Sequence, residues 1–467
     1  MFEASYFNDP NVYELVVADW CPYQPPGDDW EGFGNAVGRN TNLWEITICD
    51  MRQERLLSFL PGLALNRSIY KLTIVGMHLS DGEVWDNLIP FFNNNQAFEC
   101  LEVIMNEEDC SYPGPSASAL TSALQSFNTL KEFIIVEERT YPVSWSVDSV
   151  IEALNGHTGL RKLSCSGDMI GSEGWVALET LLLSPRSNLT TLHLIETRID
   201  ADQGVHIILA NGLAGNATLK DLEISYQWLT PTDWQPIFDA LHRSRFGLEK
   251  LKLGDNNMDD AAVLSLLSVL LRHTTTLKTL DLSGNAITDD GLIALTNALS
   301  NNLCDSSSIL STYHSNHTLE EVCINSVYRH GINSLTILTQ ESFLPVNLRS
   351  LLYFNRENNK NRVARIKIIK AHFSGIDINL KPFADMETNV LPHAIAWMAR
   401  VSNSRARATL RFPDGMSVMY QFLSTTPTLL ERFFSHYSSS SRESRLSEDL
   451  SSVVSIRQPT GGKATTS

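Results

Sequence analysis

The sequence has few basic residues and no long apolar run. It carries 36 Lys and Arg against 53 Asp and Glu, a formal net charge of −17, and such an acidic chain is a poor default partner for nucleic-acid phosphates. Its longest nearly apolar run, 261–271, is far shorter than the roughly 20 residues that cross a bilayer. We therefore expect neither a nucleic-acid partner nor a membrane span.

Targeting signals and a disulfide framework are also missing from the pattern. The first thirty residues are acidic and interrupted by proline, unlike a secretory signal. The seven cysteines are odd in number and irregularly spaced, which is typical of reduced thiols. A hydrophobic content of 43% excludes wholesale disorder. We expect a monomer in the cytoplasm, with the nucleus as an alternative compartment.

No motif for catalysis or cofactor binding stands out. The sequence GGK at 461–463 lacks the upstream glycine and the strand–helix context of a phosphate loop, and paired CxxC, HExxH and EF-hand spacings do not occur. His314 and His317 with Cys323 resemble a metal-ligand set, but His317 occupies an ordinary turn position before a strand. We predict no catalytic residues, no metal and no cofactor, and hence a protein that is not an enzyme.

The sequence does contain a repeat of about 29 residues. Its clearest copy, LKTLDLSGNAITDDGLIALTNALSNN, begins at Leu277. Further copies begin at Leu43, Ile69, Leu101, Leu130, Leu160, Leu189, Leu219, Leu248 and Leu319. From the copy at 101 to the copy at 277 successive starts lie 29 or 30 residues apart, and the last step is lengthened by an insertion near 304–315.

Each copy predicts one strand followed by one helix. The opening L-x-x-L-x-L alternates with period two, as in a strand with one buried face, and the second half places apolar residues three and four apart, as in an amphipathic helix. Such a unit buries its apolar faces only by stacking on its neighbours. Because neighbouring strands lie about 4.8 Å apart and packed helices about 8–10 Å, the stack must bend. The sequence predicts an α/β solenoid, a horseshoe with a parallel concave sheet and convex helices.

Over about residues 42–327 this pattern resembles the ribonuclease-inhibitor-like class of leucine-rich repeat proteins, whose repeats run to about 28 or 29 residues. The region after the repeats is similar to that of uncharacterised algal leucine-rich repeat proteins. The ladder asparagine of this class occurs only at Asn256 and Asn285, and the equivalent places elsewhere hold Asp168, Thr197 and Gln227. We expect other polar groups or water to close the backbone hydrogen bonds at those turns.

Four segments follow from these patterns. Residues 1–41 are predicted to be an N-terminal cap, with an aromatic peptide-docking site as the alternative; 42–340 hold about ten repeats; 341–436 form a helical C-terminal cap; and 437–467 are a disordered Ser-rich tail. Between Arg349 and Arg411 twelve basic residues stand against four acidic ones. This excess fits either an anionic partner or a cap attracted to an acidic solenoid.

Four Asn-x-Ser/Thr sequences match the glycosylation acceptor pattern. They begin at Asn66, Asn188, Asn216 and Asn316, each in the turn before a predicted strand. We interpret them as products of the repeat geometry rather than as signs of secretion.

Residues between the strand leucines should line the concave face. In the later repeats they form a mixed-charge zone that we predict to bind a partner: Lys162, Thr191, His193, Asp221, Glu223, Lys250, Lys252, Thr279, Asp281 and Glu321. Such charges tune specificity, or else they only pair laterally across neighbouring strands. In the second to fourth repeats they form an apolar patch: Val75, Val103, Met105, Ile134 and Val136. That patch is a candidate interface, unless the weaker early repeats have a shifted register that places these residues in the core.

The sequence thus favours a non-catalytic scaffold that binds a protein on the concave face. The alternative is a regulator of an enzyme, resembling a nuclease inhibitor or a Ran GTPase-activating protein, although the Ser-rich tail differs from the acidic tail expected of the latter. A third possibility is the ligand-sensing half of an immune-type receptor or a ubiquitin-ligase adaptor. Such a role would require partner chains, because no nucleotide-binding module is recognisable.

Overall fold

Eleven parallel strands form one sheet, and their order in the sheet is the same as their order in the chain. The strands are β1 (Glu14–Ala18), β2 (Glu45–Cys49), β3 (Lys71–Val75), β4 (Cys100–Met105), β5 (Glu132–Glu137), β6 (Lys162–Ser166), β7 (Thr191–Ile195), β8 (Asp221–Ser225), β9 (Lys250–Lys252), β10 (Thr279–Asp281) and β11 (Glu321–Cys323). This order is that of a solenoid, because each strand adds to the edge left by the one before it.

Helices alternate with these strands. They are α2 (Trp30–Arg39), α3 (Gln53–Leu63), α4 (Gly82–Asn94), α5 (Ala117–Gln125), α6 (Asp148–Leu154), α7 (Ser172–Leu183), α8 (Val205–Gly215), α9 (Pro231–Arg243), α10 (Asp260–Leu270), α11 (Asp289–Ser300) and α13 (Val346–Asn355). Within the described ranges, none of them is long and apolar enough to cross a bilayer.

The computed structural model describes residues 13–19, 25, 28–76, 82–105, 117–137, 146–227, 229–243, 247–270, 276–300, 317–324, 346–360, 363–364 and 367. The chain divides into two units, one made of 1–296 with 318–356 and the other of 297–317 with 357–467. The predicted insertion at 304–315, most of the predicted C-terminal cap and the predicted tail lie outside the described residues.

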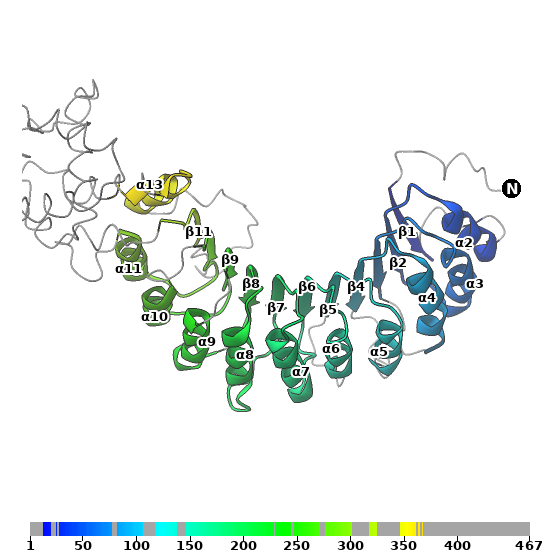
Figure 1. Cartoon of the computed structure of the whole chain (residues 1–467), viewed down its shortest axis with the longest axis horizontal. Coiled ribbons are helices and arrows are strands. Elements are labelled where there is room, and N and C mark those ends of the chain that lie inside the picture. The colour runs from blue at the N-terminus through cyan, green and yellow to red at the C-terminus, as the bar shows by residue number, and fades with distance from the viewer. Residues whose placement is uncertain are drawn as a thin grey trace, which may run out of the picture. The chain divides into compact units, whose positions relative to one another are not determined.

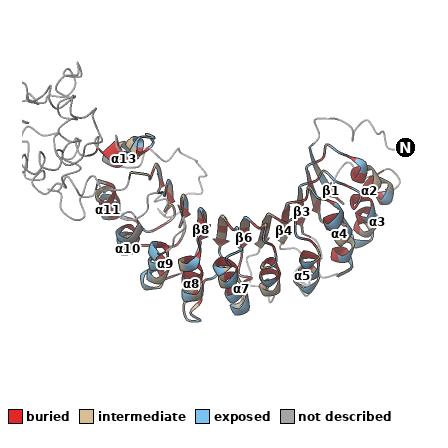
Figure 2. Cartoon of the chain, viewed as in Figure 1, coloured by how far each residue is buried: buried red, intermediate tan, exposed pale blue. Residues whose placement is uncertain are grey.

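Within the first unit the strands line the inner side of an open curve and the helices cover its outer side (Figure 1). Buried residues lie on the sides of the two layers that face each other (Figure 2). The strand leucines supply this core: Leu277, Leu280 and Leu282 are at most 1% exposed. The predicted fold class, a leucine-rich repeat solenoid with a parallel concave sheet, is confirmed.

The segment predicted as an N-terminal cap contributes a strand and a helix of its own to this stack. Strand β1 pairs with β2, and α2 packs against α3. Trp30 and Phe33 of α2 are 3% and 4% exposed, so these two aromatic residues belong to the core and do not form a docking site.

A ladder of polar side chains joins the later repeats, as the sequence implied. Asn285 donates through its amide to the carbonyl oxygen of Leu253 at 2.8 Å, and Asn256 donates in the same way to Ile224 at 2.6 Å. Gln227 continues the ladder, because its Nε2 donates to the Ser225 carbonyl at 2.9 Å and its Oε1 accepts from the Ile199 N–H at 3.1 Å. A longer amide side chain therefore closes the turn where the family asparagine is missing.

The buried asparagines of the Asn-x-Ser/Thr sequences have a structural role. Asn66 is fully buried, and its amide donates to the carbonyl oxygens of Val37 and Asn40 at 2.9 and 2.8 Å. Asn216 is 3% exposed and donates to Leu182 at 3.0 Å. Both cap the turn before a strand, which confirms the structural interpretation for these two sites; Asn316 lies outside the described residues.

Many of the strands are followed by a residue with positive φ. Gly76 and Gly284 have φ values of 59° and 68°, a region that glycine enters without strain. Glu196, Tyr226 and Asp255 adopt φ values of 56°, 57° and 54° at the same place in their repeats. The turn is thus set by the repeat geometry even where a side chain opposes it.

Candidate protein-binding face

The concave face, meaning the face of the sheet opposite the helices, carries two rows of polar residues from β6 to β11. The rows follow the strand register: Lys162, Thr191, Asp221, Lys250, Thr279 and Glu321 in one, and Ser164, His193, Glu223, Lys252, Asp281 and Cys323 in the other. All ten residues of the predicted mixed-charge zone belong to these rows, and each is half-buried or exposed while the intervening strand residues are buried. The structure brings them together on one surface.

The centre of the mixed-charge zone is His193, whose ring lies between two carboxylates. Its Nε2 is 3.5 Å from Asp221 Oδ1 and its Nδ1 is 3.7 Å from Glu223 Oε2, and all three side chains are less than 20% exposed. These distances are longer than those of well-aligned hydrogen bonds.

Lysines from the next strand flank the two carboxylates. Lys252 Nζ lies 2.9 Å from Glu223 Oε2, and Lys250 Nζ lies 3.6 Å from Asp221 Oδ2. Burial raises the pKa of Asp221, but His193 and the two lysines outweigh it and hold that pKa below its ordinary value. Burial lowers the pKa of Lys252, yet the hydrogen bond to Glu223 prevails and raises it. The lateral pairing considered from the sequence is therefore present.

The end of the mixed-charge zone is more accessible. Asp281 accepts hydrogen bonds from the N–H and hydroxyl of Ser283 at 2.9 and 2.6 Å. Glu321 is exposed, and Lys250 keeps 55% of its side-chain surface. Lys250 and Glu321 are thus the exposed members of the mixed-charge zone.

The apolar patch predicted for the early repeats is partly wrong. Val103 is fully buried and Met105 is 9% exposed, so both lie in the core. The neighbouring Ile104 faces the concave side, in register with Val75 and Val136. Of the five predicted residues, Val75, Ile134 and Val136 lie on the concave face.

The physical reason is a register error of three residues. Phe98, which is fully buried, occupies the first apolar position of this repeat, so Leu101 is its second. An odd shift exchanges the two faces of a strand, which put Val103 and Met105 on the wrong side. The aromatic residue at position 98 was the signal that a search for leucine missed.

With the register corrected, a second polar contact appears beside the apolar residues. Lys71 Nζ lies 2.8 Å from Glu102 Oε2, which also accepts from the Thr73 hydroxyl at 3.1 Å. The register predicted from the sequence did not include Glu102 among the concave residues and so missed this group. Desolvation opposes the charge of Lys71, but Glu102 raises its pKa above the ordinary value.

A further row of ion pairs runs along the edge where the strands begin, and it was also missed. Glu249 lies between two lysines, 2.8 Å from Lys278 and 3.8 Å from Lys220. Lys131 contacts Glu99 in the same way. In the later repeats the sequence carries this pattern as alternating signs at the second position: Lys220, Glu249, Lys278 and Glu320.

Metal binding and thiol reactivity were sought among the described residues. No group of three His, Cys, Asp or Glu among them is placed to hold a metal ion. Burial raises the pKa of Cys100 and Cys165 to about 12, and that of Cys323 to about 11. These thiols are therefore not activated as nucleophiles.

The family-model match and the sequence relatives agree with this geometry. Residues 273–295 match the family model described as Leucine Rich repeat. Over 140 residues the chain is 32% identical to the pig ribonuclease inhibitor, covering 30% of each protein. It is 27% identical over 199 residues to human NACHT, LRR and PYD domains-containing protein 5, covering 39% of this chain and 16% of that protein. A solved TLR13–ssRNA13 complex aligns with 61% of this chain and 39% of its own at 15% identity and a TM-score of 0.31.

The chain is therefore a leucine-rich repeat protein. Its repeats are of the ribonuclease-inhibitor-like type. It spans less than a third of the length of each of the two curated relatives named above.

Proposed function

We propose that this protein is a non-catalytic scaffold that binds a partner protein on the concave face, over β6 to β11. The observation that carries the proposal is the alternation of acidic and basic side chains in two adjacent rows, with Lys250 and Glu321 exposed at the surface. Because these groups stand on a sheet rather than on loops, a partner meets a fixed pattern of charge. Such patterns select partners and speed association more than they add affinity.

Preorganisation supports the same proposal. His193, Asp221 and Glu223 already hold one another, so binding costs little further side-chain entropy. The paired lysines limit which partners can bind. If a partner pulls a lysine away from Asp221 or Glu223, it must offer that carboxylate a new cationic contact. A partner surface with its own alternating charges meets that requirement.

The test is a quantitative pull-down with three charge reversals in the mixed-charge zone, Asp221→Lys, Glu223→Lys and Asp281→Lys, combined in one variant. The matched control reverses three exposed acidic residues outside the sheet, Glu54, Glu173 and Asp202. Partners that both the wild type and the control retain should be lost from the triple variant. If the triple variant, shown to be folded by circular dichroism, keeps every partner, the zone is not the interface.

A second candidate function is regulation of an enzyme, and the 32% identity to the pig ribonuclease inhibitor favours it. In this form the concave face would block a nuclease rather than assemble a complex. The assay is hydrolysis of RNA by pancreatic-type ribonuclease with and without the protein. Inhibition that the triple variant abolishes would favour the regulator, and unchanged hydrolysis at saturating protein would exclude it for that enzyme.

The proposed compartment is the cytoplasm and the proposed state is a monomer. The four cysteines within the described residues, Cys49, Cys100, Cys165 and Cys323, are all free thiols, which fits a reducing compartment. Sedimentation equilibrium tests the monomer.

A further inference from the structure

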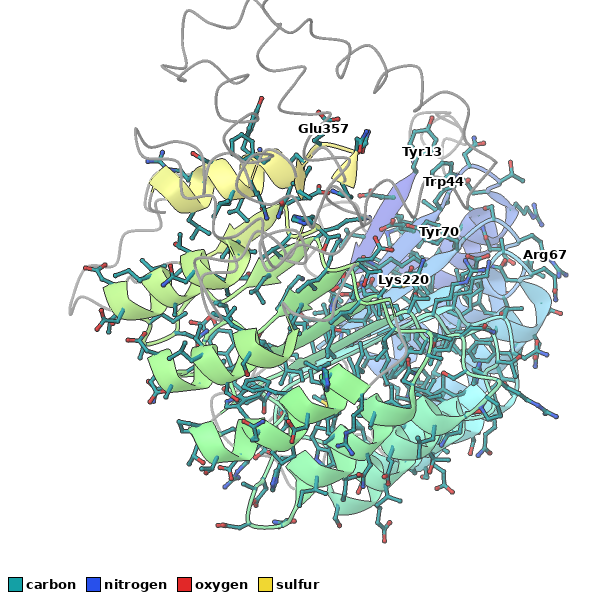
Figure 3. The ribbon with its side chains drawn as sticks, turned by 60° about the vertical axis from the view of Figure 1, so that its left-hand side comes forward. Tyr13, Trp44, Arg67, Tyr70, Lys220 and Glu357 are labelled. Atoms are coloured by element: carbon teal, nitrogen blue, oxygen red, sulfur yellow. The ribbon has the colours of Figure 1, made fainter. Side chains whose placement is uncertain are left out.

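Three aromatic residues lie exposed in a row where the first three strands begin. The Trp44 N–H donates to the Tyr13 carbonyl at 2.8 Å, and the Tyr70 N–H donates to the Trp44 carbonyl at 2.8 Å, so the three residues are direct neighbours. Figure 3 shows them following one another along this edge. Their exposed fractions are 47% for Tyr13, 56% for Trp44 and 37% for Tyr70. Single exposed aromatics are ordinary, but three side by side form a patch.

The rings of Tyr13 and Trp44 are close enough to act as one surface. The centroids of Tyr13 and Trp44 are 5.4 Å apart with the planes tilted by 47°. Each of the two residues keeps about half of its surface uncovered. A ligand can therefore contact a ring face without any rearrangement of the strands.

Two carboxylates adjoin the rings. Glu14 of β1 and Glu45 of β2 are register partners on neighbouring strands, an arrangement in which like charges repel. The Tyr70 hydroxyl donates to Glu45 Oε1 at 2.6 Å and so links the aromatic row to the carboxylates. That bond raises the pKa of Tyr70 to about 12, so the phenol stays neutral.

In the described part of the chain the basic residues nearby form their contacts mainly with other groups, although Glu45 adds a little to the raised pKa of Lys71. Lys71, the next residue in register after Glu45, directs its Nζ to Glu102 at 2.8 Å instead. The Arg67 guanidinium donates to the carbonyl of Asn94. Within the part of the chain that the structure describes, no ion pair to Glu14 or Glu45 is formed, whereas other acidic residues of the same sheet are paired.

We propose that this corner, made of Tyr13, Trp44 and Tyr70 with Glu14 and Glu45, binds a lysine- or arginine-bearing segment of a protein partner. A cation over the indole or phenol ring is attracted by the negative ring face. The carboxylates accept charge-assisted hydrogen bonds from its ammonium or guanidinium group. Binding such a segment relieves the repulsion between the two glutamates.

The corner is separate from the mixed-charge zone of the concave face. It lies on β1 to β3, whereas the mixed-charge zone lies on β6 to β11. The two surfaces also differ in the side chains around their carboxylates. In the mixed-charge zone these neighbours are lysines, and in the corner they are aromatic rings. Loss of one surface should leave the other intact, so failure of this proposal is distinguishable from failure of the proposed function.

The experiment measures binding of a fluorescein-labelled peptide of alternating arginine and glycine to the full-length protein by fluorescence anisotropy at low ionic strength. Trp44→Ala should weaken binding about threefold to fivefold, the range for an exposed cation–ring contact. The combined Glu14→Gln and Glu45→Gln variant should weaken it about fivefold to tenfold. The same peptide with citrulline in place of arginine should bind the wild type no more tightly than the arginine peptide binds the most weakened variant.

Matched controls separate the corner from a general attraction between a polycation and an acidic chain. Glu54→Gln with Glu173→Gln removes the same charge from exposed helix positions, and Tyr353→Ala removes another aromatic, 70% exposed. Both control variants should bind the arginine peptide within twofold of the wild type. The proposal is overturned if the control glutamines weaken binding as much as those at 14 and 45, if the citrulline peptide binds equally well, or if the wild type does not bind the arginine peptide.

Discussion

Asn256 shows how much a single buried amide does in this fold. Its Nδ2 donates to the Ile224 carbonyl at 2.6 Å, its Oδ1 accepts from the Gln227 N–H at 2.7 Å, and its own N–H donates to Asn285 Oδ1 at 3.1 Å. One side chain thus satisfies backbone groups that no regular strand or helix pairs. Residues of this kind join consecutive repeats.

Asn256→Ala should lower the free energy of unfolding by about 1–3 kcal/mol, because it leaves a buried carbonyl and a buried N–H without partners. Urea denaturation followed by circular dichroism measures this loss. Asn87→Ala is the control, since Asn87 is half-buried on α4 and its Nδ2 donates to the Glu83 carbonyl within the same helix. The control should change stability by less than about 0.5 kcal/mol, and equal losses would contradict the ladder.

Asp221 makes a pH-dependent contribution. Its pKa in the folded protein is below the ordinary value of 3.8, so the ionised carboxylate stabilises the fold. That stabilisation is complete above the ordinary pKa and is lost as the pH falls through the lower folded value. The wild type should therefore exceed Asp221→Asn in stability at pH 7, by a margin that shrinks below pH 3.8. Urea midpoints across this range measure the margin, and a margin independent of pH would contradict the assignment.

At the scale of elements, the closest contact lies between α2 and α3. A Cβ on Gly62 would lie 2.2 Å from the carbonyl carbon of Gly34, and a Cβ on Gly34 would lie 2.2 Å from the carbonyl oxygen of Phe59. The backbones of the two helices therefore approach as closely as they do only because both positions are glycine. This contact fixes the first repeats, including the strands that carry the aromatic corner.

Gly62→Ala should destabilise the protein by about 1–3 kcal/mol, since the added methyl group meets backbone atoms that cannot move aside. Gly82→Ala is the matched control, because a Cβ there meets nothing closer than Ala119 Cβ at 3.8 Å. Thermal unfolding of the two variants measures the difference. A Gly62→Ala variant as stable as the control would show that α2 and α3 are not in close contact.

At the scale of the whole molecule, the sheet is a one-dimensional stack in which each strand contacts only its sequence neighbours. Stability in such a stack is nearly the sum of repeat and nearest-neighbour contributions. Damage to one repeat is therefore felt most by the adjoining repeats. A binding surface on β6 to β11 and another on β1 to β3 can be altered independently for the same reason.

Hydrogen exchange tests this locality. Gly62→Ala should reduce amide protection in β1 to β4 more than in β8 to β10. Trp234→Ala should do the reverse, because Trp234 is fully buried in α9 and stacks on Phe238 at 5.7 Å. Uniform loss of protection along the sheet in both variants would contradict the one-dimensional description.

Periodicity alone identified most of this architecture. The leucines of the copy at Leu277 recur often enough that strand, helix and parallel stacking follow from burial of their apolar faces. The mixed-charge zone was predictable for the same reason, since its strands keep their register. The sequence also predicted that polar groups would close the backbone hydrogen bonds at the turns without the family asparagine. It did not predict the particular role of Gln227, whose longer side chain reaches the carbonyl groups only in the folded turn.

The sequence by itself determined the repeat, its core and the face that carries the charged residues of the later repeats. Side chains alternate between the two faces of a strand, so once the leucines are buried the residues between them must point to the other face. Between the two registers that the sequence left open, the tertiary structure decided that Val103 and Met105 turn inward, since Phe98 takes the first core position. It also decided that Tyr13, Trp44 and Tyr70 meet at one edge. Residues from three separate repeats become neighbours only when the strands align, and no local pattern of the chain encodes that distance.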